Sequence, residues 1–212
     1  MQKFLVIGMG PGAPEWTLPA AIEAAASAEV LLGSEKLINA HAGNECKKML
    51  VPLSGSIEHF LDKLETHRQN YKCAVLVTGD PGYYSLLSAV RRRFKPADFI
   101  VIPGITAFQL ACARLGLSWQ NYRLTSAHGK SLESMLARLS PEDGAVILTD
   151  RNHNPHTIGK YLTDSNWSNR NGWICENIGK EEEDIEKIEL FNIPENKEYR
   201  LCLMILQPAS AE

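Results

Sequence analysis

The sequence lacks three features that would each assign it to a class of protein: a long apolar run, a surplus of one charge, and regularly paired cysteines. No apolar stretch approaches the ~20 residues that a membrane-spanning helix needs, so we expect no membrane association. The opening K-F-L-V-I-G is a short strand-like run followed by glycines, which is not the pattern of a signal peptide. The net charge of −3 argues against a nucleic-acid-binding protein that works through its overall charge.

The five cysteines are scattered, odd in number and never spaced as C-x-x-C. Cys73, Cys112 and Cys202 lie within apolar periodic runs, which indicates buried, reduced thiols and predicts a cytoplasmic protein. The two closest histidines, His153 and His156, flank a turn, and no third ligand lies near them in the sequence. We therefore expect no metal site.

The composition is that of an ordinary globular protein, with 44% hydrophobic and 22% charged residues, and 212 residues allow one large domain or two small ones. In the first half, strand-like runs with few polar residues alternate with helical patterns, which predicts a parallel sheet with helices on both faces. One helical pattern places Ile57, Phe60, Leu61 and Leu64 on one face. The expected strands are 3–8, 29–33, 48–53, 73–77 and 98–104, and the expected helices are 17–28, 34–40, 56–70, 84–94 and 106–117.

After residue 117 the alternation continues but the pattern changes. Two strand-like runs at the end, 186–193 and 198–207, are joined by the short turn P-E-N-K, which predicts a hairpin and therefore a mixed sheet. We expect an N-terminal α/β domain over 1–115 and a C-terminal α/β domain over 116–212. The helix 106–117 is either a hinge or the first element of the second domain.

Three glycine-rich corners each follow an apolar strand of the first half: G-M-G-P-G-A-P (8–14), T-G-D-P-G-Y-Y-S (78–85) and V-I-P-G-I-T-A (101–107). The carboxyl ends of parallel strands lie along one edge of a sheet, where ligands bind. Glycine removes the side chain that would keep a ligand away from the backbone. We therefore predict that the bends at Gly10, Gly79 and Gly104 converge on a shared hollow beneath the C-terminal half.

Each corner also has a plainer interpretation. The first fits a loose G-x-G-x-x-A dinucleotide fingerprint, although Pro11 removes an amide donor where a pyrophosphate would need one. Asp80 precedes a proline and could be only the N-cap of the following helix. Thr106 and Gln109 fit a capping box, whose free backbone amides would equally suit a carboxylate.

Taken together, V-I-G-M-G-P-G, G-D-P-G-Y-Y-S and I-P-G-I-T-A resemble the tetrapyrrole (corrin/porphyrin) methylase family of S-adenosylmethionine-dependent enzymes. Within this family, R-L-T-S-A-H-G-K (123–130), L-T-D (148–150) and C-E-N-I-G-K-E-E-E (175–183) are most similar to the cobalt-precorrin-7 C5-methyltransferase branch, which corresponds to the C5-methylating half of precorrin-6Y C5,15-methyltransferase. The resemblance runs from about residue 3 to residue 190. Ala127 and Lys130 depart from the S-L-H-G-R that is usual in the branch.

The resemblance implies two α/β domains with a ligand cleft between them, a homodimer, and S-adenosylmethionine as cofactor with S-adenosylhomocysteine as product. Carried over by position, the residues that would line the cofactor site are Pro11, Gly79, Asp80, Tyr83, Thr106, Ala107, Thr149 and Asn177.

The implied substrate is a corrinoid with many carboxylate arms, methylated at C5, a carbon that can act as the nucleophile itself. His128 could take the lost proton or tune the charge of the ring, since a histidine can adopt either protonation state near neutral pH; a turn histidine bonded to the backbone is the alternative. Lys130 and Arg151 could bind the carboxylate arms. C15 methylation and decarboxylation would need a separate partner subunit.

Four other functions stay open at this point. The chain could be another tetrapyrrole methylase, or a family relative that acts on ribosomal RNA or in the diphthamide pathway. From a different class, it could be an NAD(P)-dependent corrinoid reductase that uses 8–13 as a dinucleotide loop, or a non-catalytic ligand-binding subunit.

Overall fold

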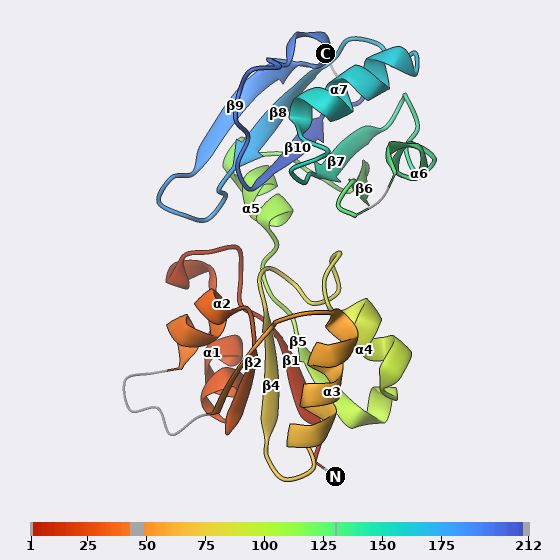
Figure 1. Cartoon of the computed structure of the whole chain (residues 1–212). Helices are drawn as coiled ribbons and strands as arrows, with labels where there is room; N and C mark the ends of the chain where they lie inside the picture. The colour runs from red at the N-terminus through yellow and green to blue at the C-terminus, as the bar shows by residue number, and fades with distance from the viewer. Residues whose placement is uncertain (1, 43–48, 130, 210–212) are drawn as a thin grey trace. The chain divides into compact units, whose positions relative to one another are not determined.

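The computed structural model of the chain describes residues 2–42, 49–129 and 131–209, which form two compact units, 1–107 and 108–212 (Figure 1). Each unit contains a five-stranded sheet with helices, the first sheet parallel and the second mixed, so the predicted fold class is confirmed. The two units divide between residues 107 and 108, so nearly all of the helix Ala107–Leu115 belongs to the second unit. The domain boundary at 115/116 stays a prediction. No helix in the described ranges is long and apolar enough to cross a membrane.

The first unit alternates strand and helix along the chain, and its sheet has the order β3-β2-β4-β1-β5 with every pair parallel. Its elements are β1 (Phe4–Gly8), η1 (Pro14–Trp16), α1 (Pro19–Ala26), β2 (Val30–Gly33), α2 (Glu35–His41), β3 (Met49–Pro52), α3 (Ile57–His67), β4 (Cys73–Val77), α4 (Leu87–Arg93), η2 (Pro96–Asp98) and β5 (Phe99–Ile102).

The helices of the first unit divide between the two faces of its sheet. In Figure 1, α1 and α2 lie on one side of the strands and α3 and α4 on the other. Strands β1 and β4 are neighbours, yet β1 continues into α1 and β4 into α4, so the chain leaves them toward opposite faces. Such a switch point opens a crevice at the carboxyl ends of the two strands, which is where open α/β sheets bind ligands.

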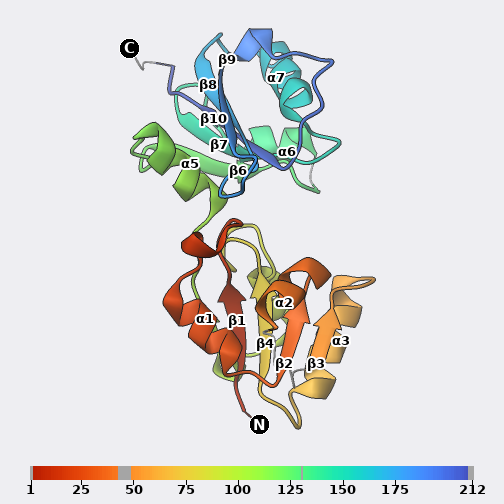
Figure 2. The ribbon, with the colours of Figure 1, turned by 90° about the vertical axis from the view of Figure 1, so that its left-hand side faces the viewer.

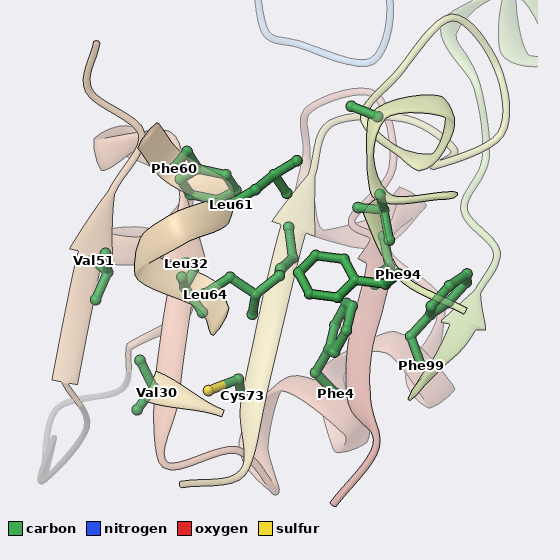
Figure 3. Packing of buried hydrophobic residues seen from close by; sticks show 14 residues of the cluster. Phe4, Val30, Leu32, Val51, Phe60, Leu61, Leu64, Cys73, Phe94 and Phe99 are labelled. Atoms are coloured by element: carbon green, nitrogen blue, oxygen red, sulfur yellow. The ribbon is translucent and has the colours of Figure 1, made fainter. Parts of the chain in front are cut away.

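The packing of α3 shows why the sequence folds this way locally. Ser56 caps the helix by accepting a hydrogen bond from the His59 backbone N–H at 3.2 Å, which satisfies one otherwise unpaired donor. Phe60, Leu61 and Leu64 then pack against the strands as predicted (Figure 3). Ile57, expected on the same face, is 46% exposed and is the first residue of the helix.

The second unit has a mixed sheet of order β6-β7-β10-β8-β9, in which only β6 and β7 are parallel. Figure 2 shows α5 on one face of this sheet and α6 and α7 on the other. The elements are α5 (Ala107–Leu115), β6 (Tyr122–Ser126), α6 (Leu132–Leu136), β7 (Gly144–Leu148), α7 (Pro155–Asp164), β8 (Asn171–Glu176), β9 (Asp184–Glu189), η3 (Leu190–Asn192) and β10 (Cys202–Leu206).

The predicted hairpin between 186–193 and 198–207 is wrong. Strands β9 and β10 both pair with β8, on its opposite sides, and the hairpin of this unit is β8–β9. The physical reason is burial: C-L-M-I-L of β10 is apolar throughout and largely buried, which requires a central position, whereas D-I-E-K-I-E of β9 is charged and suits an edge. The short P-E-N-K turn gave no information about this difference.

Truncation of Leu64 should destabilise the protein far more than the same kind of truncation at the exposed first residue of the helix, Ile57. Leu64 is 0% exposed, so Leu64→Ala is expected to cost about 2–5 kcal/mol of the free energy of unfolding. Ile57→Ala removes a side chain of the same size from the same helix at an exposed position and should cost well under about 1 kcal/mol. Urea unfolding of the two variants measures both values; equal losses would contradict the packing described for α3.

Candidate functional site

The three glycine-rich corners of the first unit meet at the carboxyl ends of β1, β4 and β5. Gly10 and Gly79 form an isolated antiparallel bridge, in which the Gly79 N–H donates to the Gly10 carbonyl at 2.7 Å. A Cβ on Gly8 would lie 2.5 Å from the Gly79 oxygen and 2.7 Å from the Gly104 nitrogen, so the backbones touch where the side chains are missing. The predicted convergence of these corners is confirmed. That they enclose a hollow beneath the C-terminal half stays a prediction.

Asp80 links two of these corners through its carboxylate. Oδ1 accepts the Gly82 N–H at 2.7 Å, and Oδ2 reaches the third corner to accept the Gly104 N–H at 3.1 Å. The first helical residue that follows is Leu87, so Asp80 is not the N-cap of α4. Its carboxylate instead fixes the loop after β4 to the loop after β5, across the end of β1 that lies between them.

The remaining predicted residues of the first unit surround this corner. Pro11 and Thr106 are buried, whereas Ala107 and Tyr83 are partly exposed. The rings of Tyr83 and Tyr84 meet edge to face with centroids 5.1 Å apart, and Tyr84 has a φ of 47°, which is unusual for a tyrosine. Strained backbone of this kind is enriched at ligand-binding loops.

Gly79 has the most room for an added Cβ among the converging glycines. Its φ of 69° favours glycine, and a Cβ there would meet nothing closer than the Thr106 Cα at 3.9 Å. The Gly79 backbone and the turn at Thr106 therefore face each other across a small gap without a side chain between them. This arrangement suits a ligand that is recognised by backbone groups.

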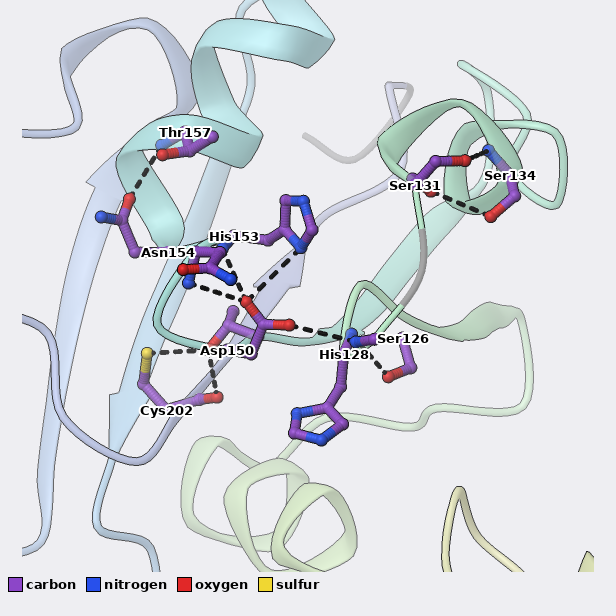
Figure 4. A network of polar contacts seen from close by, with 12 residues as sticks. Ser126, His128, Ser131, Ser134, Asp150, His153, Asn154, Thr157 and Cys202 are labelled. Atoms are coloured by element: carbon purple, nitrogen blue, oxygen red, sulfur yellow. Dashed lines mark hydrogen bonds and ion pairs between the residues drawn. The ribbon is translucent and has the colours of Figure 1, made fainter. Parts of the chain in front are cut away.

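In the second unit, Asp150 is the centre of a hydrogen-bond network at the carboxyl ends of β6 and β7 (Figure 4). Its Oδ1 accepts the N–H groups of Asn152 at 2.9 Å and His153 at 2.7 Å, and its Oδ2 accepts the Gly129 N–H at 3.1 Å. The carboxylate thus joins the turn after β7 to the turn that carries His128.

The hydrogen bonds of this network lower the pKa of Asp150. Burial alone would raise it, but hydrogen bonds from the backbone of His153 and Gly129, together with the nearby His153 ring, bring the pKa below its ordinary value. The sequence alone predicts no role for Asp150. Its only signal was the position of L-T-D at the end of an apolar strand, the same position that Asp80 has after β4.

Thr149 and Asn177, the cofactor residues predicted in the second unit, are both anchored at the start of β10. Thr149 Oγ1 donates to the Cys202 carbonyl at 2.6 Å, and the Asn177 N–H donates to the Leu201 carbonyl at 2.9 Å. Asn177 has a φ of 50°, and Leu201 is 70% exposed beside it.

The predicted catalytic residue His128 and the predicted substrate-binding residue Arg151 lie on the surface of the second unit. His128 and Arg151 are exposed, one in each of the two turns that Asp150 joins. In Figure 4 the His128 ring points away from the Asp150 carboxylate. Lys130 lies outside the described residues.

The thiols of the described residues do not suit a nucleophilic role. The four cysteines outside 43–48 are free, and three of them are buried. Burial raises the pKa of Cys73 and Cys112 to about 11 and that of Cys175 to about 12. These thiols are therefore protonated at neutral pH, and the thiolate is the nucleophilic form.

A model of the tetrapyrrole (corrin/porphyrin) methylase family matches residues 3–194. Two curated relatives are similar over most of their length. The probable cobalt-precorrin-7 C(5)-methyltransferase of Methanocaldococcus jannaschii is 27% identical, over 85% of this chain and 86% of that protein. The cobalt-precorrin-7 C(5)-methyltransferase of Salmonella typhimurium is 26% identical, over 95% and 96%.

Solved structures share the fold at lower identity. The methyltransferase CobJ has a TM-score of 0.84 and 20% identity, over 100% of this chain and 96% of that one. The uroporphyrin-III C-methyltransferase of Thermus thermophilus, whose structure is a complex with S-adenosylhomocysteine, has a TM-score of 0.76 and 20% identity, over 97% of each chain.

Adding one methyl group at Gly8 should loosen the whole glycine corner. Gly8→Ala is expected to cost about 1–3 kcal/mol or more of stability, because the new Cβ overlaps backbone atoms of Gly79 and Gly104. Hydrogen exchange of the Met9 and Gly79 amides, which close the corner, should become faster. Gly116→Ala is the control: its φ of 63° makes an alanine mildly strained, but its Cβ would meet nothing within 4 Å and it lies in the other unit, so these two amides should keep their slow exchange. Unchanged exchange in Gly8→Ala would contradict the close approach.

The stability that Asp150 contributes should depend on pH with a defined sign. Because its folded-state pKa is lowered, the contribution is fully present above the ordinary aspartate pKa of about 3.9 and is lost as the pH falls through the folded-state pKa. The difference in free energy of unfolding between wild type and Asp150→Asn is therefore expected to be constant near neutral pH and to shrink below about pH 4. Urea unfolding across this range measures it, and a difference that grows on acidification would contradict the network.

Proposed function

Because the chain belongs to the tetrapyrrole (corrin/porphyrin) methylase family and is therefore a methyltransferase, we propose that it transfers a methyl group from S-adenosylmethionine to C5 of a corrin precursor, cobalt-precorrin-7 or precorrin-6Y, in cobalamin biosynthesis. The observation that carries the proposal is the meeting of three glycine corners, two of them linked by Asp80, at the switch point of a parallel sheet. The relatives named for C5 methylation, each similar over more than four-fifths of this chain, support the choice of ring position.

The residues of the first unit fit the cofactor. Gly79 leaves the backbone open toward Thr106, and the turn is held rigid by Asp80, so the ligand would meet a preformed surface. We propose that Pro11, Gly79, Asp80, Tyr83, Thr106 and Ala107 hold it, and that Thr149 and Asn177 contribute from the second unit. The likeness to a methyltransferase solved with S-adenosylhomocysteine supports this assignment.

S-adenosylmethionine supplies an electrophilic methyl group on a sulfonium sulfur. In the transfer, the bond from sulfur to methyl breaks, the bond from methyl to C5 forms, and C5 loses a proton. The protein's task is to align the reactants and exclude water, and such alignment can supply about 7–11 kcal/mol of the barrier. We propose that His128, whose exposed side chain follows β6, accepts the proton or adjusts the charge of the ring.

The carboxylate arms of the substrate need positive charge that the net acidic chain must provide locally. Arg151 is exposed in the turn that Asp150 organises, which leaves its guanidinium accessible to a carboxylate. We propose Arg151 for this contact from its position, and Lys130 from the sequence alone.

The dinucleotide alternative is disfavoured by the element that follows the first corner. In a nucleotide-binding loop the last glycine opens a helix, whose N-terminal amides bind the pyrophosphate. Here the short η1 follows the glycines, and α1 begins only at Pro19. The fingerprint at 8–13 therefore lacks the helix that would give it its function.

The proposed function also includes an oligomeric state and a partner subunit. We propose a cytoplasmic homodimer, as the family resemblance implies. A separate subunit would carry out C15 methylation and decarboxylation of the same corrinoid.

Ligand binding and product mass test the proposal together. By calorimetry, S-adenosylhomocysteine should bind the wild-type protein and NADPH should not. Asp80→Asn should weaken that binding at least about tenfold, because Asn can accept from only one of Gly82 and Gly104. Loss of the other bond, about 1.5–3 kcal/mol for a charged acceptor, releases one side of the preformed surface. Asp98→Asn makes the same chemical change at the other end of β5 and should leave binding unchanged.

Mass spectrometry of cobalt-precorrin-7 after incubation with the protein and S-adenosylmethionine should show the gain of one methyl group. Binding of NADPH in place of S-adenosylhomocysteine would overturn the proposal in favour of a reductase. Binding of S-adenosylhomocysteine without any methylated product would contradict methylation of cobalt-precorrin-7 and would favour a non-catalytic subunit or a tetrapyrrole methylase with another substrate.

A further inference from the structure

The turn after β6 is held by three successive backbone N–H groups. The Ala127 N–H donates to the Leu148 carbonyl at 2.9 Å, the His128 N–H to Ser126 Oγ at 3.1 Å, and the Gly129 N–H to Asp150 Oδ2 at 3.1 Å. The first bond continues the sheet and the second is local. Only the third ties the tip of the turn to another segment of the chain, and it depends on a side chain.

The segment at the other end of that bond is itself folded around Asp150. Oδ1 accepts the N–H groups of Asn152 and His153, and the Asp150 N–H donates to the His153 carbonyl at 3.2 Å. The His153 Nδ1 lies 3.4 Å from Oδ1. One carboxylate therefore fixes both turns, while the side chains of His128 and Arg151 remain exposed.

Gly129 is explained by the backbone conformation of the turn and not by crowding around it. Its φ is 64°, and an added Cβ would meet nothing within 4 Å, so no neighbour excludes a side chain there. Glycine suits this position because the turn holds it in the left-handed conformation, which most other residues avoid.

We propose that Asp150 is a positioning residue for methyl transfer, which holds the 127–129 turn so that His128 meets the corrinoid in one orientation. This inference rests on the proposed function and adds to it a residue that contacts neither cofactor nor substrate. A fixed backbone beneath an exposed side chain is the arrangement expected of a group that must be placed accurately, because a displacement of about 1 Å can cost on the order of 100-fold in rate.

Steady-state kinetics of the full chain with cobalt-precorrin-7 test the inference. Asp150→Asn keeps the shape of the side chain, but its NH₂ cannot accept a hydrogen bond, so one of the two turns is released. We expect kcat to fall on the order of 100-fold, while the Kd for S-adenosylhomocysteine stays within about twofold of wild type, the usual range for a change outside the binding site. Asp143→Asn, at the opposite end of β7, is the matched control and should leave both values unchanged.

Two further variants separate positioning from a general structural role. Gly129→Ala should lower kcat in the same direction as Asp150→Asn, and Gly129→Asn should restore much of it, because asparagine tolerates the left-handed conformation. In a His128→Ala background, Asp150→Asn should have no additional effect on kcat, because residues that act as one unit are not additive.

The outcomes distinguish this inference from the proposed function. If Asp150→Asn keeps wild-type kcat, or lowers kcat equally with and without His128, the positioning role is overturned while the methyltransferase stands. If Asp150→Asn loses S-adenosylhomocysteine binding, Asp150 belongs to the cofactor site instead, and the inference is wrong. If the wild-type protein itself methylates no corrinoid, the proposed function is overturned and this inference with it.

Discussion

The structure of the first unit depends on close contact between backbones at Gly8, Gly79 and Gly104, which only the absence of side chains permits. Three loops from neighbouring strands approach so closely that their peptide groups must be paired with one another or with a buried polar group. The Gly10–Gly79 bridge supplies one pairing, and the carboxylate of Asp80 supplies the others by accepting from Gly82 and Gly104. The sheet order, in turn, brings these strand ends together.

In the second unit, too, an aspartate carboxylate joins two loops at the end of a strand. Asp80 and Asp150 both follow a buried strand, both accept the N–H of the residue two positions later, and both reach a glycine N–H in another loop. A carboxylate suits this task because its two oxygens can accept hydrogen bonds from separate segments at once. In both units, an aspartate at a strand end joins two loops through the hydrogen bonds of one carboxylate.

The sequence predicted what depends on local pattern and missed what depends on long-range pairing. Strands β1 and β4, the apolar face of α3 and the convergence of the glycine corners follow from periodicity and from the rule that parallel strands end at one edge. The partner of β10 could not be found in this way, since a short turn predicts a hairpin whether or not a third strand takes the place between. Asp150 was missed for a related reason: its partner Gly129 lies in another loop, and the sequence shows no bond between them.

The two units differ in what they present at their strand ends, and the proposed function explains the difference. The first presents backbone and glycine around Gly79, which can recognise a ligand that every family member shares, because backbone groups do not vary with sequence. The second presents the side chains of His128 and Arg151 on turns fixed by Asp150, and side chains can change between relatives while the turns persist. Under the proposed function, cofactor recognition would lie in the peptide groups of the first unit, and the choice of ring position would lie in the few exposed side chains of the second.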